Sequence, residues 1–146
     1  MTTAPAQTSL ATRIPQPIMW GLLIGSVQAA SPLGFWWLDP ATVHALLITA
    51  IASIYVGFAV ADGRPKVLAV EAAVAAAFVV FAAAGVTGPA WLLVLGYAGH
   101  GVKDMWQERH HYVANTRWWP PFCATVDFLV AAVIVVEIAA GVDFHH

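Results

Sequence analysis

The sequence predicts an all-α, polytopic integral membrane protein in which five transmembrane helices form one antiparallel bundle. Hydrophobic residues make up 60% of the 146 residues and charged residues only 10%, and the mean hydropathy is +0.76. A soluble domain of this length is far less apolar. The apolar residues also fall into runs close to the roughly 20 residues that cross a bilayer. Short breaks rich in Pro, Gly and Asp separate these runs, and such breaks interrupt helices.

The connections between the runs are short, so consecutive spans should be antiparallel neighbours. The breaks fall at Asp39-Pro40, at Asp62-Gly63-Arg64-Pro65, at Thr87-Gly88-Pro89 and in the stretch 110–121. In the first run, Ser31-Pro32 is a place where the helix kinks or ends. The predicted spans are 17–37, 42–61, 67–86, 89–107 and 120–140, within one transmembrane domain at 15–141 that lies between an N-terminal segment at 1–14 and a tail at 142–146.

The basic residues predict the orientation of this bundle. All six lie on one side of an alternating path, and the opposite side has no Lys or Arg. By the positive-inside rule, the N-terminus is then cytoplasmic and the C-terminus external in a multi-pass protein of the cell membrane. Tryptophans near both boundaries agree with an aromatic belt at each interface. The basic residues are Arg13, Arg64, Lys66, Lys103, Arg109 and Arg117.

Several functional classes are excluded by composition and motif. The net charge of −2 and the lack of a basic arm argue against a nucleic-acid partner. One cysteine, Cys123, rules out an internal disulfide framework and a cysteine-based metal site within one chain. No phosphate-binding loop, dinucleotide fingerprint, zinc-protease motif or nucleophile elbow is present. The expected partners are the lipid bilayer and a lipophilic small molecule, with a homo-oligomer left open.

Five polar side chains are expected to meet at one depth of the bundle, with a sixth one helical turn deeper. Residues equally far from a tight turn lie at similar heights in antiparallel helices. This rule places Glu71 opposite Asp104, Asp127 opposite Lys103, and Tyr55 opposite Glu71. His100 precedes Asp104 by four residues, so it lies on the same face of its helix, one turn deeper in the membrane. The predicted catalytic residues are therefore His100, Asp104, Glu71, Asp127, Lys103 and Tyr55.

Each of these residues also has a purely structural interpretation. Lys103 could only neutralise Glu71 or Asp127 in a buried pair, and Tyr55 could be a packed aromatic residue. A second group, Asn115 and Arg117 with Trp106, is predicted to bind a ligand, because the loop at 114–122 could cap the polar layer and Arg117 could recognise an anionic group. A plain helix start with an interfacial anchor explains the same loop equally well.

Four stretches together resemble a family of small bacterial multi-span membrane proteins of unknown function. They are Asp62-Gly63-Arg64-Pro65, Glu71, the run 100–107 and the stretch ANTRWWPPFC at 114–123, which is the most distinctive. The resemblance covers about the last two thirds of the chain. It implies a membrane fold, and it supplies no substrate, cofactor or catalytic residue.

The mixture of acids, bases and a phenol favours a membrane-embedded enzyme that performs acid–base chemistry on a lipophilic substrate, such as an isoprenoid, sterol-like or polyketide molecule. Asp104 or Glu71 would be the acid or base, His100 its partner and Lys103 an electrostatic stabiliser. A proton- or cation-coupled carrier is the alternative. A non-catalytic accessory subunit, packed through Gly21-x-x-x-Gly25, is a third possibility.

The same layer contains groups that favour a bound metal and one that opposes it. Carboxylate and imidazole groups on facing helices suit transition metals, with His100 and Asp104 as the first ligands to suspect. The ammonium group of Lys103 should repel a dication unless it turns away. The sequence-based expectation is therefore that the protein has no metal and no other cofactor.

Overall fold

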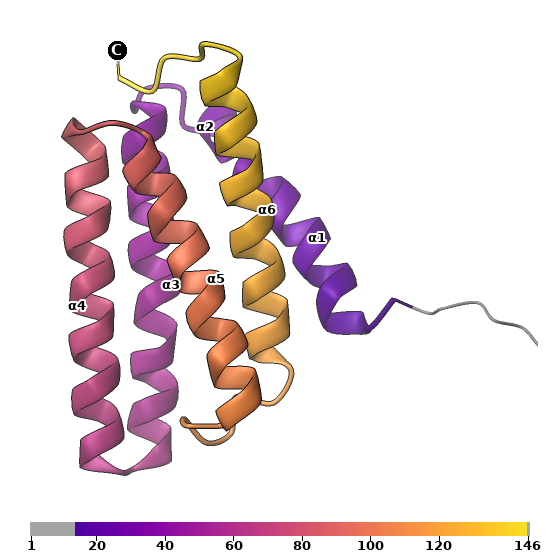
Figure 1. Cartoon of the computed structure of the whole chain (residues 1–146), viewed down its shortest axis with the longest axis vertical. Helices are drawn as coiled ribbons and strands as arrows, with labels where there is room; N and C mark the ends of the chain where they lie inside the picture. Colours follow the sequence, from indigo (N-terminus) through magenta and orange to yellow (C-terminus); the bar gives the residue numbers. More distant parts are fainter. Residues whose placement is uncertain (1–13, 146) are drawn as a thin grey trace, which may run out of the picture.

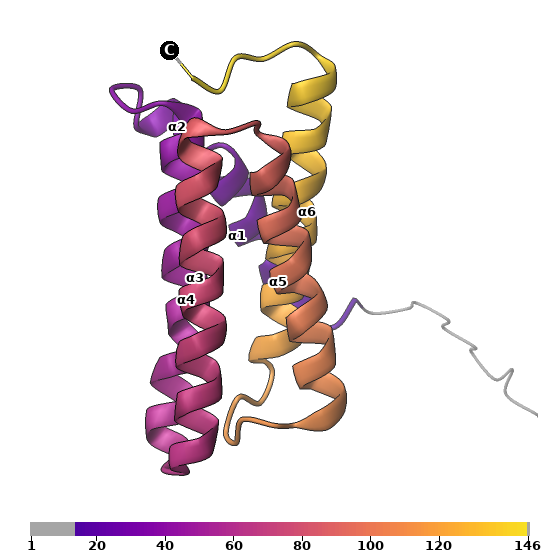
Figure 2. The same ribbon diagram turned by 60° about the vertical axis from the view of Figure 1, so that its left-hand side comes forward.

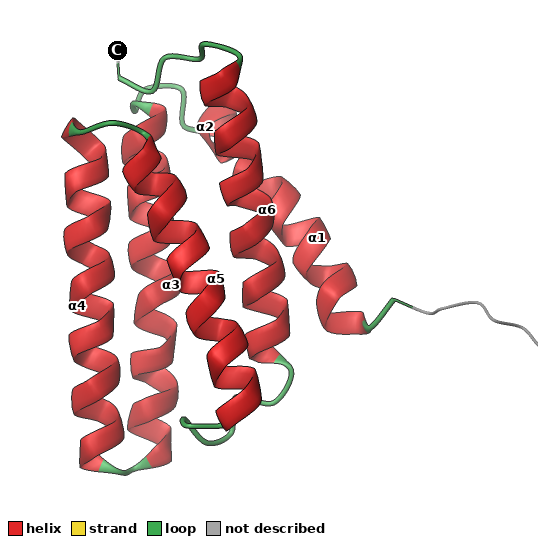
Figure 3. Cartoon of the chain, viewed as in Figure 1, coloured by secondary structure: helices red, strands yellow, loops and turns green. Residues whose placement is uncertain are grey.

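The computed structural model describes residues 14–145, and every regular element in that range is a helix (Figures 1 and 3). The predicted N-terminal segment, 1–14, therefore lies almost wholly outside the described residues. The helices are α1 (Gln16–Ala29), α2 (Ser31–Gly34), α3 (Pro40–Asp62), α4 (Pro65–Thr87), α5 (Trp91–His110) and α6 (Trp119–Ala139).

Two antiparallel hairpins form the body of the bundle. Helices α3 and α4 pair along their length, as do α5 and α6, and Figure 2 shows the two pairs side by side. Pro40 and Pro65 begin α3 and α4, where a missing amide donor costs nothing. Between them, Gly63 adopts φ 78°, a left-handed conformation that glycine reaches without steric cost. The tight α3–α4 turn therefore follows from the local sequence.

Helix α1 packs against α6, on the side of α6 away from α4 (Figure 1). A Cβ atom at Gly21 would lie 2.6 Å from the Cβ of Thr125, and one at Gly25 would lie 3.2 Å from the Cα of Val126. The two glycines therefore allow close helix contact, as small residues at helix interfaces do. The Gly-x-x-x-Gly face is used within the chain, so it does not offer a surface to another subunit.

Three helices of the described chain are long and apolar enough to cross a membrane. They are α3, α4 and α6, with mean hydropathies of 2.1, 2.4 and 2.3. The other two predicted spans do not reach this standard. The first is broken at Ala30 into α1 and the short α2, and α5 carries Lys103 and Asp104 within its length. The five-span prediction is thus supported at the level of an all-helical bundle with three candidate spans.

The predicted C-terminal tail folds back over the start of α3 (Figure 1). Phe144 is buried, its carbonyl oxygen accepts a hydrogen bond from the amide of Ala41 at 3.2 Å, and its ring packs against His44. The ring of His145 lies 3.4 Å from the carbonyl oxygen of Gly85. The tail therefore belongs to the packed structure at that end of the bundle.

Candidate functional site

The polar residues of α5 lie on the face of the helix that is turned into the bundle. His100, Asp104 and Gln107 are each at most 1% exposed, and their spacing of four and three residues keeps them on one stripe. On the same face, Gly101 has no side chain, and the ring of Phe128 lies 3.0 Å from where its Cβ would be. Helix α6 can therefore approach α5 closely beside His100.

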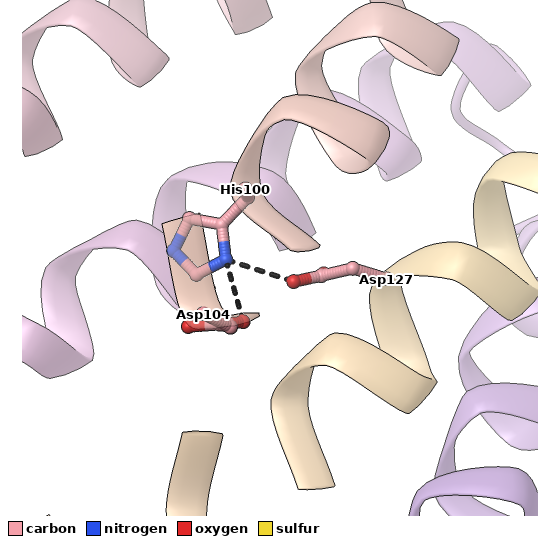
Figure 4. A group of neighbouring side chains, drawn as sticks. All are labelled: His100, Asp104 and Asp127. Atoms are coloured by element: carbon pink, nitrogen blue, oxygen red, sulfur yellow. Dashed lines mark hydrogen bonds and ion pairs between the residues drawn. The ribbon is translucent and has the colours of Figure 1, made fainter. Parts of the chain in front are cut away.

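The imidazole of His100 is held between two carboxylates (Figure 4). Its Nδ1 atom lies 2.8 Å from Oδ2 of Asp127 on α6 and 3.2 Å from Oδ2 of Asp104 on α5. Both aspartates are completely buried. A single ring nitrogen thus faces two acidic oxygens from two helices, and a neutral imidazole has one proton at most to offer there.

Lys103 joins this centre to the other hairpin. Its Nζ atom lies 2.7 Å from Oε2 of Glu71 on α4 and 3.2 Å from the ring centroid of Tyr55 on α3. A cation over an aromatic face is attracted by the ring quadrupole. The structure therefore brings together all six residues that the sequence nominated as catalytic, from four helices. We call these six residues the polar centre.

The polar centre has an unbalanced charge and unused hydrogen-bonding capacity. Its three carboxylates face a single ammonium group, so the centre carries two uncompensated negative charges when all three carboxylates are ionised and His100 is neutral. Among the described residues, Oδ1 of Asp127 and Nε2 of His100 are buried without a hydrogen-bond partner, and Asp104 is paired with the Nδ1 atom of His100, which it shares with Asp127. Buried charges and polar groups are costly unless something satisfies them. The centre is therefore suited to take up a further cation or polar ligand.

Aromatic rings enclose the polar centre. The ring of Phe78 meets His100 edge-on at a centroid distance of 4.9 Å, and the ring of Tyr55 lies at 6.0 Å. A surface groove of about 290 Å³ between α1, α5 and α6 is lined by Met105 and Glu108, which point away from the centre. That groove is separate from the site.

Sequence reasoning missed Cys123 as a neighbour of the polar centre. This thiol is buried on α6 and lies within electrostatic range of Asp104 and Asp127. The signal was available, because Cys123 precedes Asp127 by four residues, one helical turn.

The three predicted ligand-binding residues are not brought to the polar centre. Trp106, Asn115 and Arg117 are all exposed, and the ring of Trp106 stacks on His110 at 4.9 Å. Asn115 and Arg117 adopt φ 63° and 49° in the α5–α6 loop, a left-handed conformation uncommon for residues other than glycine. Their binding role stays a prediction about the loop surface.

Gln107, near the C-terminal end of α5, joins that helix to the loop that follows it. Its Nε2 donates to the carbonyl oxygen of Val113 at 2.8 Å, and its Oε1 accepts from the amide of Val113 at 3.2 Å. Its Nε2 also lies 3.5 Å from the hydroxyl of Thr116. The side-chain amide thus replaces backbone partners that the buried loop would otherwise lack.

The turn between α3 and α4 also forms hydrogen bonds to the α5–α6 loop. Asp62 accepts a hydrogen bond from the amide of Ala114 at 2.7 Å, and Arg64 donates to the carbonyl oxygen of Tyr112 at 2.7 Å. Arg64 also pairs with Asp62, and the hydrogen bonds that it donates there raise the pKa of the guanidinium. Two of the stretches that carry the family resemblance therefore touch in space.

A second buried polar group lies further along α5, toward α2 and the C-terminal tail. The hydroxyl of Tyr97 donates to the carbonyl oxygen of His44 and accepts from Nε2 of Gln28, each at 3.2 Å. The ring of His44 is fully buried and packs against the rings of Tyr97 and Phe144. We call His44, Tyr97 and Gln28 the neutral polar group.

One set of residues in the described chain has the spacing to hold a metal ion. His100, Asp104 and Asp127 each offer a ligand atom, and these atoms lie within 4.8 Å of one another. Comparison with known proteins adds nothing to this assignment, because no family model, curated protein or solved structure matches the chain.

Proposed function

We propose that α5 and the α1–α2 segment also cross the membrane, which completes the five-span bundle. Helix α5 has 20 residues, or about 30 Å at 1.5 Å per residue. Its charges lower its hydropathy, but Lys103 and Asp104 are turned into the bundle, and the outward face presents Val102 and Met105. Helix α1 likewise exposes Val27 and other apolar residues. The basic residues then place the N-terminus in the cytoplasm and the C-terminus outside.

Membership of the small bacterial multi-span family is part of this proposal. It rests on the sequence resemblance of those four stretches alone.

We propose that the protein is a membrane-embedded enzyme that carries out acid–base chemistry on a lipophilic substrate. One observation carries the proposal. An imidazole, three carboxylates, an ammonium group and a phenol from four helices meet in one buried layer, and several of their polar atoms lack partners. Mixed groups in a shared, desolvated layer are typical of catalytic sites. A purely structural layer would leave fewer polar atoms unsatisfied.

The packing beside His100 suggests how a substrate from the bilayer would enter. Gly99 is exposed on α5, and the ring of Phe78 lies 3.8 Å from where its Cβ would be. Phe78 is half-buried and meets the imidazole edge-on. A rotation of this ring would expose that edge of His100 to the lipid, so this is the side from which a hydrophobic molecule would reach the centre.

Lys103 and Tyr55 are well placed to stabilise negative charge that develops on the substrate. Glu71 fixes the ammonium group of Lys103, so the charge is already positioned before reaction, which is the condition for efficient electrostatic stabilisation. His100, Asp104 and Asp127 form the reacting centre beside it.

The test is conversion of lipophilic compounds by the purified protein. Bacterial lipid extracts are incubated with the unsubstituted protein, with Asp104→Asn and with Glu108→Gln, which alters an exposed acid one turn further along the same helix. We expect a species that changes with the unsubstituted protein and with Glu108→Gln, and not with Asp104→Asn. If no species across a broad lipid panel depends on Asp104, the enzyme proposal is wrong.

A cation-coupled carrier is the second candidate, and the neutral polar group favours it. Tyr97 lies three residues from His100, so polar side chains continue along the buried face of α5 toward the other end of the bundle. Proteoliposomes that report internal pH and cation content would decide. Flux that Glu71→Gln or Asp127→Asn abolishes would favour the carrier over the enzyme.

A further inference from the structure

We infer that His100, Asp104 and Asp127 form a binding site for one divalent transition-metal ion. The site lies between α5 and α6 in the buried half of the polar centre (Figure 4). The inference concerns what occupies the centre. It does not rest on the proposed enzymatic activity, because a metal site can be structural, catalytic or part of a transport path.

The distances within the triad fit a coordination shell. Nitrogen and oxygen ligands lie about 2.0–2.2 Å from zinc, so neighbouring ligand atoms at right angles around one ion are about 3 Å apart. Nδ1 of His100 lies 2.8 Å from Asp127 Oδ2 and 3.2 Å from Asp104 Oδ2. A hydrogen bond would explain one of these contacts, but one ring proton cannot serve both acceptors well. A cation between the three atoms satisfies all of them.

The charge of the polar centre also fits a dication. With His100 neutral, as a metal ligand must be, and with all three carboxylates ionised, the centre has two uncompensated negative charges. Asp104 is fully buried, and its Oδ2 shares the one Nδ1 atom of His100 with Asp127. Oδ1 of Asp127 is buried without a hydrogen-bond partner among the described residues. Incompletely paired buried carboxylates are costly. One divalent cation would offset the negative charge and give these oxygens a partner.

The objection raised by the charge of Lys103 does not hold in this structure. Its ammonium group is paired with Glu71 at 2.7 Å and lies over the ring of Tyr55. That charge is therefore neutralised by a carboxylate outside the triad. Glu71 and Lys103 together form a neutral neighbour of the metal site, not a competitor for it.

The donor set indicates the kind of metal. Imidazole with carboxylates suits zinc, iron, manganese or cobalt, whereas calcium and magnesium prefer oxygen ligands alone. Metal sites in helix bundles are built in the core from inward-projecting side chains of facing helices, as these three ligands would be. Oδ1 of Asp127 has no hydrogen-bond partner among the described residues, which leaves room for bidentate coordination.

The inference can be tested on the full chain purified in detergent through a tag without histidine. Elemental analysis of the unsubstituted protein should show near-stoichiometric zinc, iron, manganese or cobalt. After chelation, titration with Co²⁺ should give a saturable visible absorption band. His100→Ala and Asp127→Asn should each lower metal affinity at least about tenfold, the minimum expected when even a supporting partner of a metal ligand is lost.

His110→Ala is the matched control, because it removes an exposed histidine from the same helix. It should retain the metal and the cobalt band. A folded, monodisperse unsubstituted protein that neither contains nor takes up a transition metal would overturn the inference, whatever the variants do. Metal that is lost in His110→Ala and kept in His100→Ala would overturn it as well. Neither result depends on whether any lipid is converted, so the enzyme proposal is judged separately.

Discussion

The polar centre and the neutral polar group occupy two heights of the same helix, α5, and satisfy burial in different ways. At the neutral polar group, Tyr97 donates to a backbone carbonyl and accepts from Gln28, so each hydrogen bond is made between uncharged groups, while both ring nitrogens of buried His44 lack a hydrogen-bond partner among the described residues. At the polar centre, charged groups from α4, α5 and α6 face one another, and Oδ1 of Asp127 is left without a hydrogen-bond partner. The first arrangement joins helices through uncharged groups. The second gathers charged groups, which gives it the capacity to bind a cation.

The difference between them has an energetic consequence. An uncharged buried group that loses its partner forfeits about 1–3 kcal/mol at most in ordinary cases. A buried charge that loses its partner costs about 3–5 kcal/mol. The loss of folding stability caused by a substitution on α5 should therefore be larger when the partner that remains buried is charged than when it is uncharged.

The largest effect is expected for Lys103→Met. The substitution leaves Glu71 as a buried, uncompensated carboxylate, because the described ion pair of Glu71 is with Lys103. We expect a loss of about 3–5 kcal/mol in the free energy of unfolding, measured by denaturant unfolding in mixed micelles. Removal of both charges in Lys103→Met/Glu71→Leu should restore most of that loss.

Lys66→Met is the control for this experiment, since Lys66 is exposed at the start of α4. It should change stability little. If Lys103→Met were as stable as the unsubstituted protein, or if the double substitution gave no recovery, the pair would not be a buried charge pair and the contrast between the two groups would fail.

An intermediate effect is expected for Gln107→Leu. Gln107 is uncharged, but its amide satisfies both the amide and the carbonyl of buried Val113. Loss of both bonds should cost about 1–3 kcal/mol and should increase hydrogen exchange at the Val113 amide. Gln107→Glu keeps an acceptor for that amide, so it should protect Val113 better than leucine does. Unchanged exchange at Val113 in Gln107→Leu would contradict the assignment.

The smallest effect is expected for Tyr97→Phe, which removes one hydroxyl from the neutral polar group. Hydrogen bonds between membrane helices contribute about 0.6 kcal/mol on average, so thermal unfolding in micelles should shift only slightly. In the Tyr97→Phe background, Gln28→Leu should add little, because the bond between the two side chains is already gone. If Tyr97→Phe lowered the free energy of unfolding as much as Lys103→Met, uncharged and charged buried groups would not differ in their contribution to stability.

The sequence by itself determined the helical class, the positions of the breaks and the depth of the polar residues. Asp-Pro and Asp-Gly-Arg-Pro interrupt the apolar runs for local reasons, and in the structure α3 begins at Pro40 and ends just before the turn at Gly63. Depth follows from a constant rise per residue. Counting residues from the turns is therefore enough to place Tyr55, Glu71 and Asp104 in one layer.

Only the tertiary structure decided which members of that layer touch. Contact depends on how far each helix is rotated about its axis, and rotation is set by packing at distant points, such as the approach of Phe128 to Gly101. A rotation of this kind pairs Asp127 with His100 and leaves Lys103 to Glu71. It also buries Cys123 beside the centre, and it leaves Arg117 and Asn115 on the surface of the loop. Sequence spacing fixes height along a helix, whereas the direction in which a side chain points is a property of the whole bundle.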